Sequence, residues 1–319
     1  GRDAVGRPSS GGVGGPVTEH SGGARRLRIG DDVHEIDRPW IMGIVNATPD
    51  SFSDAGEHQT VDDRVALGRG HAADGAQVVD IGGQSGITGV PEIDPSEEIA
   101  RVLPVVDGLR RESTVLTSVD TYKPAVVLAV LGAGASIIND VSGLLYPGVA
   151  EICAEHRSAL VLMHNRSRPK ERLTDPHLYT DVVDDVVSFI DEKMRLAVSL
   201  GVDEESIILD PGPDFSKTPF QTIETLRAID RVLAFGRPVL LALSRKDFVG
   251  ALTRRSPRDR LAGTLAAIGS LLEHPGLILR VHDVAPVADY LRVADALAGR
   301  TPVVPDLELP VELRRHRAG

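Results

Sequence analysis

Cysteine is almost absent from this chain of 319 residues, since Cys153 is its single example. One cysteine excludes an internal disulfide framework and is typical of a protein kept in a reducing cytoplasm, where we expect this one. Aromatic residues make up only 3% of the chain, so the core must be built from alanine, valine, leucine and isoleucine. No uninterrupted apolar run is long enough to cross a membrane.

Positive charge is also scarce, because 35 lysines and arginines face 46 aspartates and glutamates, leaving a net charge of -11. A surface of that sign has no uniform positive field to attract phosphate backbones or anionic lipids. We therefore expect neither nucleic acid nor a membrane as a partner. A local phosphate site made by a few basic side chains and backbone donors stays compatible with this charge.

The chain divides into three parts by composition. Residues 1–26 are rich in glycine, serine and proline and contain almost nothing to bury, so we expect a disordered tail. Residues 27–305 carry the apolar periodicity of a folded domain. Residues 306–319 then read as a C-terminal extension.

Eight short apolar runs alternate with segments of helical periodicity such as 62–74, 123–131 and 181–200. The runs are 41–45, 78–81, 117–119, 136–138, 160–163, 207–209, 239–243 and 277–281. Continuous apolar strands in a β–α repeat predict a parallel sheet buried on both faces. The economical closure is a (β/α)₈ TIM barrel behind a short N-terminal hairpin over 27–36. A doubly wound open sheet is the alternative.

Polar residues follow every one of the predicted strands. In chain order the clearest are Asn46, Asp80, Asp120, Asn139, His164, Asp210, Lys246, Arg280 and His282. A single polar strand end is usually a satisfied turn or a helix cap. Eight together at one barrel mouth are poorly explained by capping, and active sites of this fold lie at that face.

Three of these residues suggest a particular ligand. Asp120, Asn139 and Asp210 would bring two carboxylates and an amide into a half-buried cup. Such a set suits a flat heterocycle with fused N–H donors, such as a pterin, because each donor must meet an acceptor once it leaves water. Arg280 can stack on such a ring. The alternative is that some acids are structural, Asp140 for instance as a helix N-cap.

Basic residues gather late in the chain, at Lys217, Lys246 and Arg280, with His282 nearby. The last strands of a barrel commonly hold phosphate. We therefore predict a diphosphate clamped by these donors and by a cation held at Asn46. The alternative reading of His282 is a buried core histidine.

The segment 41–56, in which an apolar run breaks at Asn46 into a polar stretch ending near Asp54, closely resembles the first signature of the dihydropteroate synthases. The other strand ends resemble the family's remaining signatures. The resemblance implies a transferase of folate biosynthesis that joins (7,8-dihydropterin-6-yl)methyl diphosphate to p-aminobenzoate and releases diphosphate. It also implies Mg²⁺ as cofactor and a homodimer.

The resemblance further implies a role for each matched residue. Asn46 would contact the magnesium diphosphate, and Arg280 with His282 would bind the departing diphosphate. The pterin would be held by Asp120, Asn139, Asp210 and Lys246. Catalysis would then depend on Asn46, Asp54, Lys246, Arg280 and His282, largely by stabilising charge and by orientation.

Departures from the family pattern lie around the amine acceptor, in a region that also holds Lys217. The family's second loop reads Gly-Gly-Glu-Ser-Thr-Arg-Pro-Gly, whereas this chain has Ile87 in place of the arginine that pairs with Asp54. Asp247 stands where the family has a serine that helps to receive the p-aminobenzoate carboxylate. Asp247 would bring a like charge to that carboxylate or would satisfy a helix N-terminus.

Three functions follow from this pattern. The first is a working synthase with diverged acceptor loops. The second is a paralogue that binds the pterin diphosphate but uses another acceptor, or that has lost synthase activity and acts as a binding or partner protein. The third is a pterin-binding methyltransferase domain, against which Lys246, Arg280 and His282 argue because that chemistry has no use for a diphosphate clamp.

Overall fold

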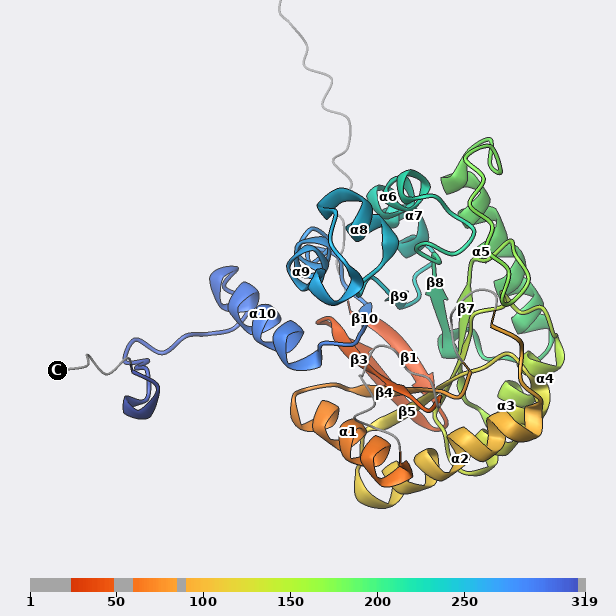
Figure 1. Ribbon diagram of the computed structural model, residues 1–319, viewed down its shortest axis with the longest axis horizontal. Coiled ribbons are helices and arrows are strands. Elements are labelled where there is room, and N and C mark those ends of the chain that lie inside the picture. Colours follow the sequence, from red (N-terminus) through yellow and green to blue (C-terminus); the bar gives the residue numbers. More distant parts are fainter. Residues whose placement is uncertain (1–23, 49–59, 85–89, 315–319) are drawn as a thin grey trace, which may run out of the picture.

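The fold of the chain is a closed barrel of eight parallel strands, seen in a computed structural model that describes residues 24–48, 60–84 and 90–314 (Figure 1). The strands neighbour one another in the order β10-β3-β4-β5-β6-β7-β8-β9. Their bounds are β3 Trp40–Asn46, β4 Val78–Gly82, β5 Leu116–Asp120, β6 Ile137–Asp140, β7 Ala159–Met163, β8 Ile207–Asp210, β9 Val239–Leu241 and β10 Leu277–Val281. The predicted barrel is therefore confirmed, and the open-sheet alternative is wrong.

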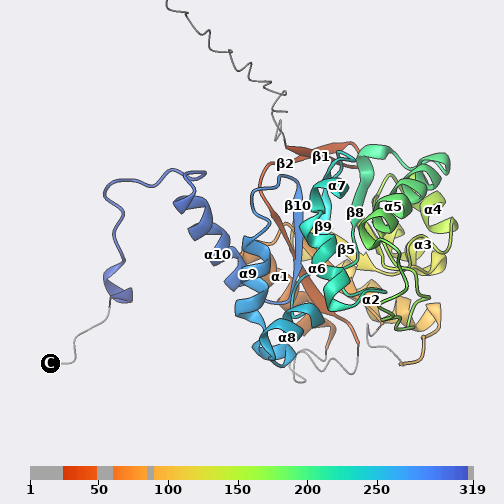
Figure 2. The same cartoon turned by 90° about the horizontal axis from the view of Figure 1, so that it is seen from above.

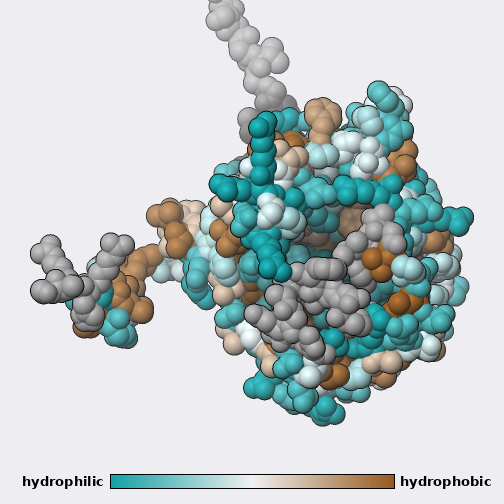
Figure 3. All heavy atoms as spheres, in the orientation of Figure 1, coloured by the Kyte–Doolittle hydropathy of each residue, from teal (hydrophilic) through white to brown (hydrophobic). Residues whose placement is uncertain are grey.

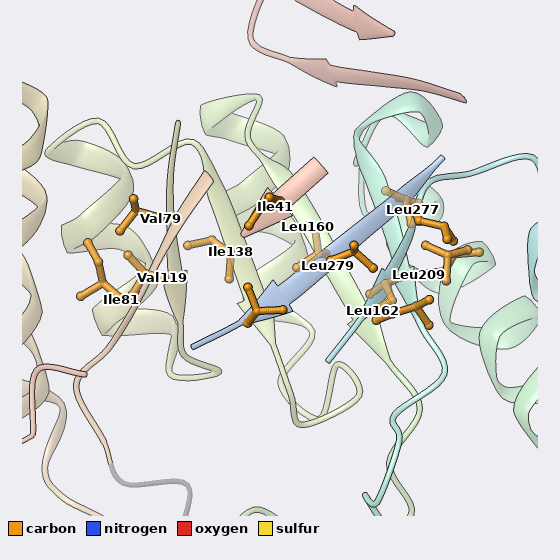
Figure 4. Packing of buried hydrophobic residues seen from close by; sticks show 14 of the residues in the cluster. Ile41, Val79, Ile81, Val119, Ile138, Leu160, Leu162, Leu209, Leu277 and Leu279 are labelled. Carbon is orange, nitrogen blue, oxygen red and sulfur yellow. The ribbon is translucent and has the colours of Figure 1, made fainter. Parts of the chain in front are cut away.

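The strands are apolar throughout because both of their faces are buried. Alternate residues point outward to the helices, and Figure 4 shows Val79, Ile81 and Val119 among this outer layer. The other residues fill the inside of the barrel, where Met42 and Ile137 are fully buried. With so few aromatic residues, both layers are built from branched aliphatic side chains, as the composition predicts.

Helices surround the barrel, and most of them follow a strand. Their bounds are α1 Val61–Ala73, α2 Pro95–Glu112, α3 Pro124–Gly132, α4 Gly148–His156, α5 Val182–Ser199, α6 Pro219–Arg227, α7 Ile229–Leu233, α8 Asp247–Thr253, α9 Leu261–Gly269 and α10 Val284–Leu297, with short 3₁₀ turns at Glu204–Ser206, Pro257–Asp259 and Val311–Leu313. Local sequence explains several starts: Thr60 and Asp63 form a capping box for α1, and Pro95 opens α2. In the described part of the chain, no helix has the length and apolarity to cross a membrane.

A two-stranded hairpin, β1 (Arg25–Ile29) and β2 (Asp32–Ile36), lies across the N-terminal end of the barrel (Figure 2). The register pairs Ile29 with Asp32, so two residues make the turn, and Gly30 supplies its positive φ of 61°. Leu27 and Ile36 are fully buried against the inside of the barrel. The hairpin therefore closes one end, which leaves the other end for a site.

The C-terminal residues leave the barrel. After α10 the chain runs away from the body as an extended segment (Figures 1 and 2). Several of its apolar side chains are exposed, Leu307 by 71%, as is Leu297 near the end of α10 by 85%. At the left of Figure 3, where this part leaves the body, brown spheres mark apolar residues on its surface.

Candidate active site

A cavity of about 500 Å³ lies at the carboxyl ends of the strands, where this fold places its chemistry. Six predicted residues line it and come from four strands and from the N-terminus of α8. They are Asp120, Asn139, Asp210, Lys246, Asp247 and Arg280. The structure thus brings together the residues predicted for the pterin with the acceptor-side Asp247.

The floor of the cavity is an ion-pair network centred on Arg280. Its Nε lies 2.7 Å from Oδ2 of Asp80, and its Nη2 lies 3.0 Å from Oδ2 of Asp120. The Asn139 amide also donates to Oδ2 of Asp80, at 3.2 Å. Asp80 is fully buried. The guanidinium is therefore fixed in place before any ligand arrives.

Several acceptors around this floor have no donor within the described residues. They include Oδ1 of Asn139 and Oδ1 of Asp80, both buried. Burial raises the pKa of Asp120 to about 7 and the pKa of Asp210 to about 6. A ligand with N–H groups would supply the missing hydrogen bonds and favour the anionic carboxylates.

Asp140 has a structural role that the sequence left open. It is buried, and Oδ1 accepts hydrogen bonds from the backbone N–H of Ser142 at 2.7 Å and from the Ser142 hydroxyl at 2.6 Å. Burial raises the pKa of Asp140 to about 6. It does not cap α4, whose N-cap is Pro147. Asp140 instead holds the turn after β6 and stays out of the cavity lining.

Lys246 follows β9 and projects towards the cavity. Its Nζ lies 4.4 Å from the centre of the Phe215 ring, a cation–π contact between the loops after β9 and β8. Burial lowers the pKa of Lys246, and the nearby carboxylates of Asp214 and Asp210 oppose that effect. Phe215 was not among the residues predicted from the sequence, because nothing in its local pattern sets it apart from core phenylalanines.

Asp247 lies at the edge of the cavity between two arginines. Its carboxylate oxygens are 2.9 Å from Arg172 and 3.2 Å from Arg260. Burial alone would raise the pKa of Asp247, but the hydrogen bonds from Arg260 and Arg172 hold it below its ordinary value. The backbone N–H of Asp247 donates to Oδ2 of Asp214 at 2.5 Å. The acceptor-side donors are thus already engaged by internal carboxylates.

His282 stands beside the cavity lining, one residue beyond β10. Its Nδ1 lies 3.0 Å from the Ser244 hydroxyl. Burial, reinforced by Arg245 and Arg280, lowers the pKa of His282 to about 3. The ring is therefore neutral at pH 7, and with Nδ1 accepting from Ser244 it keeps Nε2–H as a donor. The neighbouring Arg245 is occupied by Asp283 at 2.7 Å.

Lys217 lies deeper than the sequence suggested and does not line the cavity. It is 1% exposed, and its Nζ is 2.7 Å from Nδ1 of His164. The loop after β7 lines the cavity instead, through Arg168, Lys170 and Arg172. The density of basic residues after that strand is the sequence signal for this part of the lining.

Asn46 is the last residue of β3 and is half-buried beside Gly82 in the barrel register. Asp54, predicted as catalytic, and Ile87, predicted for the acceptor region, lie outside the described residues. Among the residues that the structure describes, no three histidines, cysteines or acids converge as a metal site. Asn46 offers a single neutral oxygen, which fits a Mg²⁺ ion that takes its other ligands from phosphate oxygens and water.

Comparisons with known proteins agree with this geometry. Residues 42–282 match the family described as pterin binding enzyme. The chain is 39% identical over 265 residues to a dihydropteroate synthase of Bacillus subtilis, covering 83% of this chain and 90% of the relative.

Solved structures give the same result. A dihydropteroate synthase of Xanthomonas albilineans with 4-aminobenzoic acid superimposes with a TM-score of 0.79 at 40% identity, covering 88% of this chain and 100% of that one. The Xanthomonas albilineans enzyme in complex with 7,8-dihydropteroate gives 0.76 at 41% identity, covering 87% and 100%. The family resemblance expected from the strand ends is confirmed: this chain belongs to the pterin binding enzymes, among the relatives of the dihydropteroate synthases.

Proposed function

We propose that this protein transfers a dihydropterin-6-ylmethyl group from its diphosphate to p-aminobenzoate, with release of diphosphate. The new bond joins the pterin methylene carbon to the arylamine nitrogen, and the carbon–oxygen bond to diphosphate breaks. The amine loses one proton to solvent. The protein then needs no strong base, because an arylamine is already neutral at pH 7.

One observation carries the donor half of the proposal. The cavity floor holds buried acceptors without donors, namely Oδ1 of Asn139 and Oδ1 of Asp80. Within the described chain, Asp210 uses only Oδ1, for the Gly212 N–H at 2.7 Å. A pterin edge carries N–H groups spaced to meet such acceptors, and an unmade buried hydrogen bond costs about 1–3 kcal/mol. The floor therefore favours a ligand of this kind.

The diphosphate would lie towards Arg280, His282 and Asn46. The neutral His282 can donate Nε2–H to a phosphate oxygen without the repulsion that a second buried cation beside Arg280 would add. A Mg²⁺ ion bound to the diphosphate, with Asn46 as its protein ligand, would neutralise charge on the leaving group. Arg280, already fixed by Asp80, would stabilise the charge that develops as the bond breaks.

The acceptor would enter between the loops after β7, β8 and β9. Phe215 and Lys246 form one wall of this approach, and Lys246 supplies positive charge beside the ring. A flat arylamine can pack on Phe215 while its nitrogen faces the pterin methylene, which is the orientation that the displacement requires.

A second function has one observation in its favour. At the acceptor side, Asp214 already accepts from the Asp247 N–H, and Asp247 already engages Arg172 and Arg260. A carboxylate ligand would compete with these internal carboxylates. This arrangement favours a pterin-diphosphate-binding protein with a different acceptor or without synthase activity.

A steady-state assay separates the two functions. Purified full-length protein is mixed with the pterin diphosphate, Mg²⁺ and p-aminobenzoate, and both diphosphate and dihydropteroate are measured. The synthase proposal predicts both products in equal amounts, with activity lost in Asp210→Asn and kept in the surface variant Asp289→Asn. Tight pterin binding without dihydropteroate would reject the synthase and support the second function.

We also infer a homodimer. Neighbouring helices α6 and α8 expose Phe220 by 70% and Leu252 by 68%, and apolar side chains on adjacent helices are typical of a subunit interface. Light scattering of the full chain tests this, and a monomer at all concentrations would contradict it.

A further inference from the structure

Lys217 is a buried cation outside the cavity lining, on the loop between β8 and α6. It is 1% exposed and, among the described residues, is the bulkiest of the fully buried side chains. Its Nζ lies 3.0 Å from the Gly212 carbonyl oxygen and 3.1 Å from the Phe215 carbonyl oxygen, with Nδ1 of His164 at 2.7 Å. The three N–H donors of the ammonium thus have three acceptors, which is the condition for keeping a charge in the interior.

A second contact of His164 fixes its Nδ1 as the hydrogen-bond acceptor for Lys217. Nε2 of this fully buried ring is 2.8 Å from Oδ1 of Asp185 on α5. Burial lowers the pKa of His164 to about 4, so the ring is neutral and gives Nε2–H to Asp185. Nδ1 is then left to accept from Lys217. Arg166 holds the same carboxylate, with both Nε and Nη2 at 2.9 Å.

The loop that Lys217 binds has an unusual backbone. Gly212, Asp214 and Ser216 all have positive φ, at 64°, 63° and 51°. Non-glycine residues in that region cost free energy and persist where other contacts enforce them. Two carbonyl oxygens of this loop accept hydrogen bonds from the Lys217 ammonium, so Lys217 holds the loop in this conformation.

The same loop presents two side chains to the acceptor side of the cavity. Phe215 faces the Lys246 ammonium at 4.4 Å. Asp214 accepts from the Asp247 N–H and is anchored by Thr222, whose hydroxyl lies 3.0 Å from the Asp214 N–H. Asp120 and Asn139 of the pterin floor belong to β5 and β6, outside this loop. Asp210, the third pterin residue, directly precedes the loop and accepts from the Gly212 N–H at 2.7 Å, but the hydrogen bonds of Lys217 go to His164, Gly212 and Phe215 and not to Asp210.

We infer that Lys217, held by His164 and Asp185, is a positioning residue that sets the place of Phe215 and so determines acceptor binding but not pterin binding. The consequence for the acceptor rests on the proposed function. The placement of Phe215 does not rest on it.

The first test uses the variants Lys217→Met and Phe215→Ala, with Lys193→Met as the control. Lys193 lies on α5, outside the cavity lining. We expect Lys217→Met to leave the Kd for the pterin diphosphate within about twofold by calorimetry, while the KM for p-aminobenzoate rises about tenfold or more. Phe215→Ala should match it, and the double variant should be no worse than Phe215→Ala, because both act through one ring.

Two results would overturn this assignment. One is a Lys217→Met protein whose pterin affinity falls as much as its acceptor KM rises, because Lys217 would then have no selective effect on the acceptor side. The other is a double variant whose acceptor KM is the product of the two single effects.

The second test does not need turnover. Lysines are labelled with ¹³C-methyl groups by reductive methylation, and the Lys246 signal is assigned with Lys246→Arg. We expect a ring-current shift from Phe215 in the unaltered protein, and its loss in both Lys217→Met and Phe215→Ala. A Lys246 signal unchanged in Lys217→Met would reject the inference. A changed signal in a protein without synthase activity would reject the proposed function alone.

The pH dependence of the acceptor KM provides a third test. The charged groups around Lys217 are Asp185, Asp210, Asp214 and Lys246, together with the neutral His164. Burial lowers the pKa of Lys217 to about 7, whereas p-aminobenzoate does not titrate between about pH 6 and pH 9. The acceptor KM should therefore rise with pH across this range in the unaltered protein and in Lys193→Met. In Lys217→Met that rise should be absent, and its persistence there would contradict the positioning role.

Discussion

The side chain of Asp247 bridges Arg172 and Arg260, at 2.9 Å and 3.2 Å, on the acceptor side of the cavity. These residues come from the loop after β7, the start of α8 and the segment before α9. The two arginines that could bind the carboxylate of an incoming acceptor are therefore already paired with the carboxylate of Asp247.

Replacing Asp247 by serine should improve use of p-aminobenzoate. Removing a nearby like charge is worth about 1 kcal/mol when solvated, or roughly fivefold in KM. Steady-state kinetics with varied p-aminobenzoate measures it. Asp289→Ser is the control, because Asp289 sits in an exposed ion pair with Arg292 on α10. An acceptor KM that stays the same in Asp247→Ser would show that Asp247 does not limit acceptor binding.

Replacing Asp120 by alanine should strongly weaken pterin binding. The change removes an acceptor from the cavity floor and frees Arg280 from one of its two carboxylates. Loss of a hydrogen bond to a charged group costs about 1.5–3 kcal/mol, so affinity should fall roughly 10- to 150-fold or more. Calorimetry with the pterin diphosphate measures it, and Asp230→Ala, at an exposed position, is the control. Unchanged affinity in Asp120→Ala would refute the pterin assignment.

Replacing Asp210 by asparagine should stabilise the ligand-free protein above about pH 6 while weakening pterin binding. The folded-state pKa of Asp210 is about 6, above its ordinary 3.8, so the folded protein holds that proton more tightly than the unfolded chain. The resulting stability is present below pH 3.8 and is lost as pH rises through 6. Asparagine does not titrate, so Asp210→Asn should avoid this loss of stability, which is at most roughly 3 kcal/mol.

Urea unfolding at about pH 4 and about pH 8 tests this prediction. The free energy of unfolding of Asp210→Asn should exceed that of the unaltered protein only at the higher pH. Equal differences at both values would mean that the effect of the substitution does not come from titration of Asp210.

Replacing Gly212 by alanine should be far more damaging than replacing Gly236. Both glycines have positive φ, but a Cβ on Gly212 would lie 2.1 Å from the His164 carbonyl oxygen, whereas a Cβ on Gly236 would have no atom within 4 Å. We expect a loss of about 1 kcal/mol at Gly236, from conformation alone. At Gly212 the loss should exceed about 3 kcal/mol. Thermal unfolding compares them, and equal losses would show that the loop after β8 can move away from His164.

The barrel itself could be predicted from the sequence. Strands buried on both faces, such as β7 from Ala159 to Met163, leave a continuous apolar run that a helix repeat does not produce. Polar residues directly after those runs, such as Asp120 and Asn139, had to meet at one end of the barrel because all eight strands are parallel.

Contacts between distant loops could not be predicted in this way. The pair of Arg280 with Asp80 joins residues 200 positions apart, and only the closed register of β10 on β3 and β3 on β4 brings them together. The position of Lys217 depends on the conformation of its loop, and its grouping with Lys246 and Arg280 late in the chain suggested a phosphate ligand. In the structure Lys217 is buried, and its ammonium donates to backbone carbonyl oxygens instead.

The most direct test is a single turnover with the protein in excess over the pterin diphosphate, in the presence of Mg²⁺ and labelled p-aminobenzoate. Quenched samples are analysed for diphosphate and for label in dihydropteroate. We expect diphosphate and labelled dihydropteroate to appear at the same rate and in equal amounts. Diphosphate released while the label stays in p-aminobenzoate, or bound pterin diphosphate that never reacts, would contradict it.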